Sequence, residues 1–228
     1  MRVPAAVVLV LAAVAPAPFS QRVQLRTDDG VTLAATWYEP SSRPAPAVVL
    51  VHMLGRNRRD WDALASRLAS EGIGALALDL RGHGESQGLP SDLAAMVQDV
   101  RTARRFVSTR PDAGGRIGIL GASLGATLAV IEAVDDQAVA SVALLSPSLD
   151  YRGLRVDAAA RKYGTRPMLL VASDDDGYAA RSARDLKKGA ETRREILVLP
   201  HAGHGTRMLT ENPDLVQALV VWFRRTLL

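Results

Sequence analysis

The sequence predicts an α/β protein in which a mostly parallel sheet is covered by helices on both faces, and three observations support this. Short apolar runs alternate with segments of helical periodicity along nearly the whole chain. Runs such as Val48–Val51 and Met168–Val171 are apolar at every position, which is typical of strands buried on both faces. Asp29-Gly30 separates two short extended runs and predicts an antiparallel hairpin. We therefore expect a three-layer α/β/α sandwich whose sheet opens with that hairpin.

The apolar and β-branched runs predict an eight-stranded sheet, and the 3.6-residue periodicity predicts the helices between the strands. The strands are expected at Arg22–Arg26, Val31–Tyr38, Ala47–His52, Ala75–Leu78, Ile117–Leu120, Val139–Leu145, Met168–Ala172 and Glu195–Leu199. The helices are expected at Trp61–Glu71, Leu93–Ser108, Leu124–Val134, Tyr178–Gly189 and Asp214–Leu227. A longer connection, Ser146–Arg166, has room for a further short helix that leans over the functional site.

The first residues have the layout of a secretory signal peptide. Arg2 precedes the apolar run Val3–Ala15, and a proline-rich segment of small residues follows as far as Ser20. Prolines interrupt the run before it reaches the about 18 apolar residues that a membrane anchor needs. We expect residues 1–20 to be removed, with cleavage after Ala17 or near Ser20, and residues 21–228 to form one domain. The mature protein is then exported, periplasmic or secreted, without a stable membrane span.

Composition excludes several function classes. The 228 residues contain no cysteine, so a thiol nucleophile and a disulfide are both excluded. The formal net charge is +4, and the arginines are scattered through the helical segments instead of forming one run. No aromatic residues interleave with these charges, so we expect a solvated basic surface and no nucleic-acid partner.

The centre of the predicted site is the motif Gly121-x-Ser123-x-Gly125, which lies between an apolar strand and a helical pattern. A sharp strand-to-helix turn lifts the serine hydroxyl clear of the sheet, and the flanking glycines make room for neighbouring backbone. The motif alone is weakly specific, and its context gives it weight. We expect Ser123 to be a nucleophile, with the N–H of Leu124 directed at a developing oxyanion.

A serine nucleophile needs a base and a carboxylate that orients the base. His204, in a glycine-flanked loop after the last strand, is the expected base, and His201 is the alternative. Three aspartates follow the preceding strand; of these Asp176 is favoured as the acid, Asp175 and Asp174 stay open, and Asp150 is a more distant candidate. The remaining aspartates of the cluster are expected to cap the next helix or to lie in water.

The loop after the third strand is expected to supply the second oxyanion donor, from the backbone N–H of Leu54 or Met53. His52, at the end of that strand, is interpreted as a residue whose hydrogen bonds shape the loop. Three arginines beyond the loop, Arg56, Arg58 and Arg59, are mainly expected to be solvated, with attraction of an anionic substrate as the alternative.

These motifs, in this order, resemble the α/β-hydrolase superfamily. The resemblance rests on His52-x-x-Gly55, Asp79-x-Arg-Gly-His-Gly-x-Ser86, the serine motif, the aspartate cluster and Gly203-His204, and it covers the chain from about residue 22 onwards. The chain looks most similar to compact bacterial carboxylesterases and dienelactone-hydrolase-like members without a large cap domain. Two residues depart from the family pattern, because Met53 and Ser173 stand where many members carry glycine.

The resemblance implies hydrolysis of small-molecule esters through an acyl-enzyme, without a metal or an organic cofactor. It maps Ser123 to the nucleophile, Asp176 to the acid and His204 to the base. The serine motif separates the chain from dehalogenases and epoxide hydrolases, which use an aspartate there. The rival functions are a peptidase or acyltransferase on the same fold, and a binding protein that kept the fold without catalysis.

Overall fold

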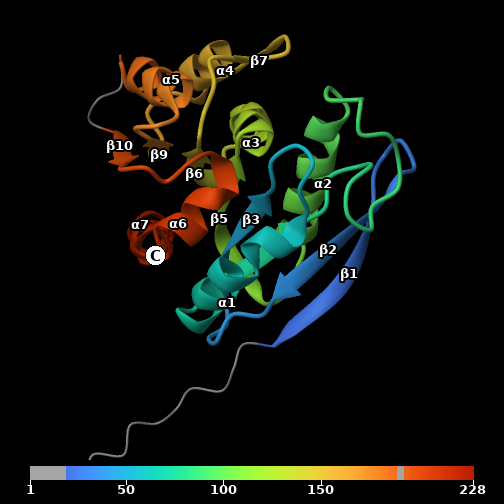
Figure 1. Ribbon diagram of the computed structural model, residues 1–228. Coiled ribbons are helices and arrows are strands. Elements are labelled where there is room, and N and C mark those ends of the chain that lie inside the picture. The colour runs from blue at the N-terminus through green and yellow to red at the C-terminus, as the bar shows by residue number, and fades with distance from the viewer. Residues whose placement is uncertain (1–18, 189–192) are drawn as a thin grey trace, which may run out of the picture.

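The computed structural model describes residues 19–188 and 193–228, and these form one large sheet covered by helices (Figure 1). The predicted signal peptide lies outside the described residues apart from Phe19 and Ser20, and Ser20 begins the first strand. Between residues 19 and 228, with 189–192 set aside, no helix is both long and apolar enough to cross a bilayer.

The main sheet has eight strands in the order β1-β2-β4-β3-β5-β6-β9-β10. Their bounds are β1 Ser20–Arg26, β2 Thr32–Tyr38, β3 Ala45–Val51, β4 Gly74–Leu78, β5 Ala113–Ala122, β6 Val139–Leu145, β9 Met168–Ser173 and β10 Arg194–Leu199. β2 pairs antiparallel with both β1 and β4, and the remaining pairs are parallel. The predicted eight-stranded, mostly parallel sheet with an opening hairpin is therefore confirmed.

Helices cover both faces of this sheet. One face carries α2 (Met96–Ser108), α3 (Leu124–Val134), α4 (Val156–Tyr163) and α5 (Gly177–Lys187), and the other carries α1 (Asp62–Ser70) and α7 (Asp214–Leu227). Along β3, Val49 and Val51 belong to the first core, whereas Val48 and Leu50 belong to the second. All four are fully buried, which explains why the strand is apolar at every position.

Four helical segments differ from the expectation. The predicted helix 61–71 is preceded by a separate 3₁₀ turn, η1 (Arg58–Trp61), and α2 begins at Met96 because the residues before it form a turn on the Asp92 carboxylate. The turn η2 (Gly205–Arg207) and the short helix α6 (Met208–Glu211) were not expected.

The long connection does contain a helix. It begins with the small hairpin of β7 (Asp150–Tyr151) and β8 (Leu154–Arg155) and continues as α4. Val156 and Tyr163 are among the α4 residues buried in the same core as α3, so the helix extends the layer on that face of the sheet. No large cap domain is present in the described residues.

Every predicted site residue follows the carboxyl end of a parallel strand. The loop after β3 carries Leu54, the turn after β5 carries Ser123, the loop after β9 carries Asp176, and the loop after β10 carries His204. Because parallel strands point the same way, their carboxyl ends meet at one edge of the sheet, where α/β proteins bind ligands.

Helix α3 approaches β3 so closely that its second residue must be glycine. A Cβ on Gly125 would overlap the carbonyl oxygen of Val51, whereas a Cβ on Gly177, the first residue of α5, would lie 3.5 Å from the Arg181 guanidinium. We expect Gly125→Ala to cost about 3 kcal/mol through overpacking. In a chain of this size that lowers Tm by roughly 6–12 °C.

The matched change Gly177→Ala is expected to leave Tm unchanged or to raise it slightly, because alanine is the better helix former. Thermal unfolding followed by circular dichroism measures both. Equal Tm values for the two variants would contradict the close approach of α3 to β3.

Candidate active site

Ser123 occupies a strained turn between β5 and α3. Its backbone has φ 51° and ψ −110°, in the left-handed half of conformational space that serine rarely adopts. Such strain costs about 1–3 kcal/mol and persists only where the surroundings impose it. Here the Ser123 N–H donates to the Leu145 carbonyl at 2.8 Å, and a Cβ on Gly121 would overlap the Gly125 carbonyl. The half-buried serine is therefore held at the top of the sheet.

Asp176 and His204 form a short hydrogen bond between two distant loops. The His204 Nδ1 lies 2.6 Å from Asp176 Oδ2. The other carboxylate oxygen of Asp176 accepts the Ala179 N–H at 3.2 Å and caps α5. Because the cap fixes the carboxylate and the carboxylate accepts at Nδ1, the Nε2 atom of His204 is left for a second partner.

The neighbouring aspartates bind the same histidine loop along its backbone. Asp174 Oδ1 accepts the His201 N–H at 2.7 Å, and Asp175 Oδ1 accepts the Gly203 N–H at 3.2 Å. Hydrogen bonds from Ser173 and from Gly203 lower the pKa of the Asp175 carboxyl, so it is ionised at neutral pH. These two aspartates were expected to cap α5 or to lie in water; Asp176 itself is the cap, and both side chains are exposed.

The alternatives to His204 and Asp176 lie elsewhere. The His201 side chain is 86% exposed and lies 3.7 Å from Asp174. Asp150 is exposed in the small hairpin, where its carboxylate accepts the Gly153 N–H at 2.7 Å. Of the histidines and aspartates considered, the structure therefore brings His204 and Asp176 together.

The residue after His204 packs against the residue before Ser123. A Cβ on Gly205 would lie 3.8 Å from the Cβ of Ala122 and would overlap the sulfur of Met53. The Gly205 N–H also donates to Ser146 Oγ at 2.9 Å, at the carboxyl end of β6. These contacts bring the residue after His204 next to the turn that carries Ser123.

The peptide orientations after β3 distinguish the two candidate oxyanion donors. The His52 carbonyl faces α3, since a Cβ on Gly125 would lie 2.7 Å from its oxygen, so the N–H of Met53 points the opposite way. The Met53 carbonyl accepts His52 Nδ1 at 2.8 Å and the Arg56 N–H at 3.2 Å. In the same peptide unit the N–H of Leu54 points opposite to the Met53 carbonyl, and therefore away from His52 Nδ1 and the Arg56 N–H.

His52 shapes this loop, as its position in the sequence predicts. The ring is fully buried, and its Nε2 accepts the Leu80 N–H at 3.0 Å while Nδ1 donates to the Met53 carbonyl. Burial lowers the pKa of His52 from 6.5 to about 4, although the hydrogen bond to Met53 raises it. The ring is therefore neutral at physiological pH, with its proton on Nδ1.

The three arginines beyond the loop each face a carboxylate. The pairs are Arg56 with Asp60 at 2.7 Å, Arg58 with the buried Asp79, and Arg59 with Glu85 at 3.8 Å. Their charge is thus balanced by neighbouring side chains. The expectation of a solvated side chain is wrong for Arg58, which is buried, and is confirmed for Arg56 and Arg59, which are exposed.

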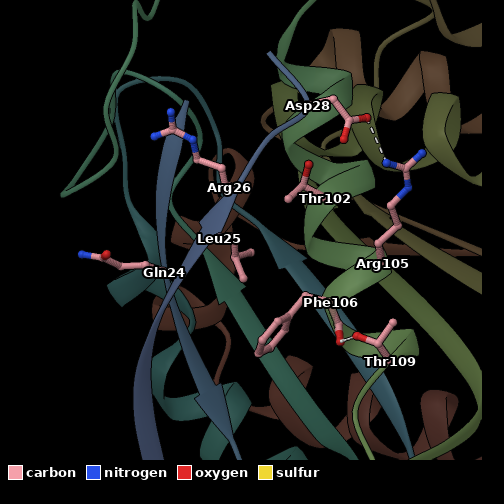
Figure 2. A pocket seen from close by; sticks show the side chains of 8 residues that line it. All are labelled: Gln24, Leu25, Arg26, Asp28, Thr102, Arg105, Phe106 and Thr109. Atoms are coloured by element: carbon pink, nitrogen blue, oxygen red, sulfur yellow. Dashed lines mark hydrogen bonds and ion pairs between the residues drawn. The ribbon is translucent and has the colours of Figure 1, made fainter. Parts of the chain in front are cut away.

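A cavity of about 300 Å³ has the lining residues that Figure 2 shows. It is lined by residues of β1 and α2 with the turn after β1, and an ion pair of 2.9 Å between Arg105 and Asp28 stands on one side. None of the predicted site residues lines it. In the part of the chain that the structure describes, no group of three or more His, Cys, Asp or Glu side chains could hold a metal ion.

Three polar residues that hold the site, Ser146, Asp60 and Thr206, were not singled out in the sequence, and Ser173 was noted only because it stands where many members carry glycine. Ser173 Oγ accepts the Ala202 N–H at 2.7 Å, Ser146 holds Gly205, and Thr206 donates to Asp60 at 2.6 Å. Ser146 also has φ 49°, a left-handed backbone conformation that no local sequence pattern predicts.

Comparisons with known proteins agree with this architecture. The family described as "Serine aminopeptidase, S33" matches residues 42–164. An uncharacterized protein of Mycobacterium tuberculosis is 30% identical over 223 residues, which cover 89% of this chain and 78% of that protein. Monoglyceride lipase of Homo sapiens is 27% identical over 135 residues, which cover 57% of this chain and 44% of the lipase.

Among solved structures, an esterase of Pyrococcus furiosus matches with a TM-score of 0.78 at 18% identity, and the match covers 92% of each chain. A likeness at this identity establishes the shared fold. What the site can do chemically has to be argued from its residues.

The buried His52 predicts a specific loss of stability in acid. Above pH 6.5 the ring is neutral in both the folded and the unfolded chain, but between pH 6.5 and about 4 only the unfolded chain binds the proton. The free energy of unfolding should therefore fall by up to about 3 kcal/mol across that window. Urea unfolding at several pH values measures it.

His52→Gln should show a shallower pH dependence than the wild type, and His201→Gln, at an exposed position, should not differ from the wild type. If the free energy of unfolding fell equally in the wild type and in His52→Gln between pH 6.5 and 4, the interpretation that the folded chain keeps His52 neutral would be wrong.

Proposed function

We propose that this chain, which belongs to the α/β-hydrolase superfamily and to its serine aminopeptidase S33 family, is a serine hydrolase that acts on carboxylic esters. The observation that supports the proposal is the 2.6 Å bond between His204 Nδ1 and Asp176 Oδ2, in a loop whose next residue, Gly205, packs beside Ala122 at the strained turn of Ser123. The chain belongs to a hydrolase family, its sequence is similar to that of a lipase, and its fold is that of an esterase.

The first half-reaction forms an acyl-enzyme. Ser123 Oγ attacks the ester carbonyl carbon while His204 Nε2 takes the hydroxyl proton, and the Asp176 carboxylate stabilises the resulting imidazolium. The tetrahedral intermediate collapses, the C–O bond to the alcohol breaks, and His204 returns the proton to the leaving alkoxide. In the second half-reaction water attacks the acyl carbon while His204 takes its proton, the C–O bond to Ser123 Oγ breaks, and His204 returns the proton to Oγ as the carboxylic acid leaves.

Two backbone N–H groups are proposed to hold the oxyanion. Leu124 is the first residue of α3, so its N–H has no partner within the helix and lies at the positive end of the helix dipole. Leu54 is favoured over Met53 as the second donor, because the Met53 N–H points away from α3. Removing one such donor typically costs about 10²–10³ in turnover.

An ester substrate is favoured over a peptide. The described residues contain no large cap domain, a feature that commonly restricts peptide substrates on this fold, and a small-molecule ester needs none. Acyl transfer to an added alcohol, or the absence of any turnover, are the outcomes that would favour the rival functions.

Replacing the nucleophile tests the proposal. Ser123→Ala should lower kcat/KM on short p-nitrophenyl esters by at least about 10³-fold, because no hydroxyl remains to form the acyl-enzyme. A fluorophosphonate probe should label the wild type at Ser123 and should not label the variant. Ser108→Ala, which changes a serine bonded to the Arg105 carbonyl on α2, is the control. An unchanged rate for Ser123→Ala would remove the assignment.

Replacing the acid separates its two hydrogen bonds. Asp176→Asn keeps an N-cap side chain of similar capping strength, so the free energy of unfolding should change by less than about 1 kcal/mol. The amide cannot stabilise an imidazolium as the carboxylate does, so kcat should fall by about 10²–10⁴-fold. Stopped assays at saturating ester measure kcat, with Asp175→Asn as the matched control. Loss of kcat in Asp175→Asn but not in Asp176→Asn would reassign the acid.

A further inference from the structure

A side-chain bridge joins the loop after β3 to the loop that carries His204. Arg56 donates to both carboxylate oxygens of Asp60, from Nε at 2.9 Å and from a terminal nitrogen at 2.7 Å. The Thr206 hydroxyl donates to the same carboxylate at 2.6 Å. Arg56 lies two residues after Leu54, and Thr206 lies two residues after His204. The bridge therefore links the loop after β3, which carries the proposed oxyanion donor Leu54, directly to the histidine loop, which carries the proposed base His204.

The Asp60 carboxylate is built into this position. It lies in η1, where its N–H donates to the Asn57 carbonyl at 3.2 Å, and its side chain is only 9% exposed. A carboxylate buried to this extent needs hydrogen bonds to stay charged. Burial raises the pKa of Asp60, but the hydrogen bonds from Arg56 and Thr206 outweigh it, and the net pKa is below the usual value. The bridge is therefore ionic and fixed at neutral pH.

A second contact reinforces the bridge between the same loops. The sulfur of Met53 lies so close to Gly205 that any Cβ there would overlap it. The Thr206 hydroxyl lies 3.7 Å from the same sulfur. Met53 precedes Leu54 and Gly205 follows His204, so these contacts also join the oxyanion loop to the base loop. Met53 stands where many family members carry glycine, and the glycine at position 205 leaves room for the Met53 side chain.

We propose that Asp60 is a positioning residue of the active site, which holds the His204 loop against the oxyanion loop through Arg56 and Thr206. The inference rests on the proposed ester hydrolysis. Asp60 acts through His204 and Leu54 and does not touch the substrate. The base and the oxyanion donor come from loops that are distant in the chain, so their relative placement depends on contacts of this kind. A misplacement of about 1 Å in such a pair can cost about 10²-fold in rate.

Thr206→Val tests the bridge most cleanly, because it removes the hydroxyl while leaving a side chain of similar shape and the Arg56–Asp60 pair. We expect kcat to fall by about 10-fold or more with KM within about twofold of the wild type. Thr206→Ser keeps the hydroxyl and should restore kcat to within about threefold of the wild type. A residue that only supports folding would not give this split between kcat and KM, nor this rescue.

Asp62→Asn is the matched control for Asp60→Asn. Asp62 lies two residues further along and accepts the Tyr38 hydroxyl at 2.6 Å, away from the histidine loop. Asp60→Asn should lower kcat as Thr206→Val does, and Asp62→Asn should leave kcat unchanged. Arg56→Gln removes the bridge from the exposed side, since Arg56 is 55% exposed, and it provides a variant that should fold even if the buried changes do not.

The outcomes separate this inference from the proposed function. A wild type that neither hydrolyses esters nor reacts with the fluorophosphonate probe would overturn the proposed function. An active wild type whose kcat is unchanged in folded Thr206→Val, Asp60→Asn and Arg56→Gln would overturn the bridge alone. Thermal unfolding of each variant verifies that the compared proteins are folded.

Discussion

The close contact between the first turn of α3 and the carboxyl end of β3 is the constraint on which the site depends. Gly125 lies against the carbonyl oxygens of Val51 and His52, so the turn of Ser123 and the loop after β3 start from adjacent backbone. Ser123, two residues before Gly125, has a left-handed conformation that a free serine would avoid, and such strain persists only where the surroundings impose it.

The remaining parts of the site are held by loops that bind one another. Asp174, Asp175 and Asp176 bind successive groups of the histidine loop, two through backbone N–H groups and one through the imidazole ring. Asp60 binds the same loop from the opposite side through Thr206. Irregular backbone at a functional site needs such partners for its polar groups, because no strand or helix satisfies them. The polar side chains around the proposed relay therefore position it as well as solvate it.

Much of this architecture could be predicted from the sequence, for identifiable reasons. Strands buried on both faces are apolar throughout, so β6 has the expected bounds and β3 and β9 are close to them. The bounds of α7, which has clear periodicity, also match, as do those of α3, which is buried on nearly all sides. The association of Asp176 with His204 is the pairing that residue order suggested. Ser146 and the pair of Asp60 with Thr206 could not be found, because these hydrogen bonds join residues far apart in the chain: Ser146 binds 59 residues away and Thr206 binds 146 residues away. Ser173 was noted only as a departure from glycine, and its bond to the Ala202 N–H was not foreseen for the same reason. No local pattern records such a contact, and the short elements η2 and α6 depend on the same tertiary packing.

The central claim is that a hydroxyl, an imidazole and a carboxylate from three loops form one relay beside two backbone donors. A crystal structure of the protein after reaction with an alkylphosphonate tests it most directly, since the adduct mimics the tetrahedral intermediate. We expect phosphorus bonded to Ser123 Oγ, His204 Nε2 facing that oxygen, and the phosphoryl oxygen about 3 Å from the N–H groups of Leu124 and Leu54. An adduct on another residue, or an imidazole of His204 turned away from Ser123, would contradict the account.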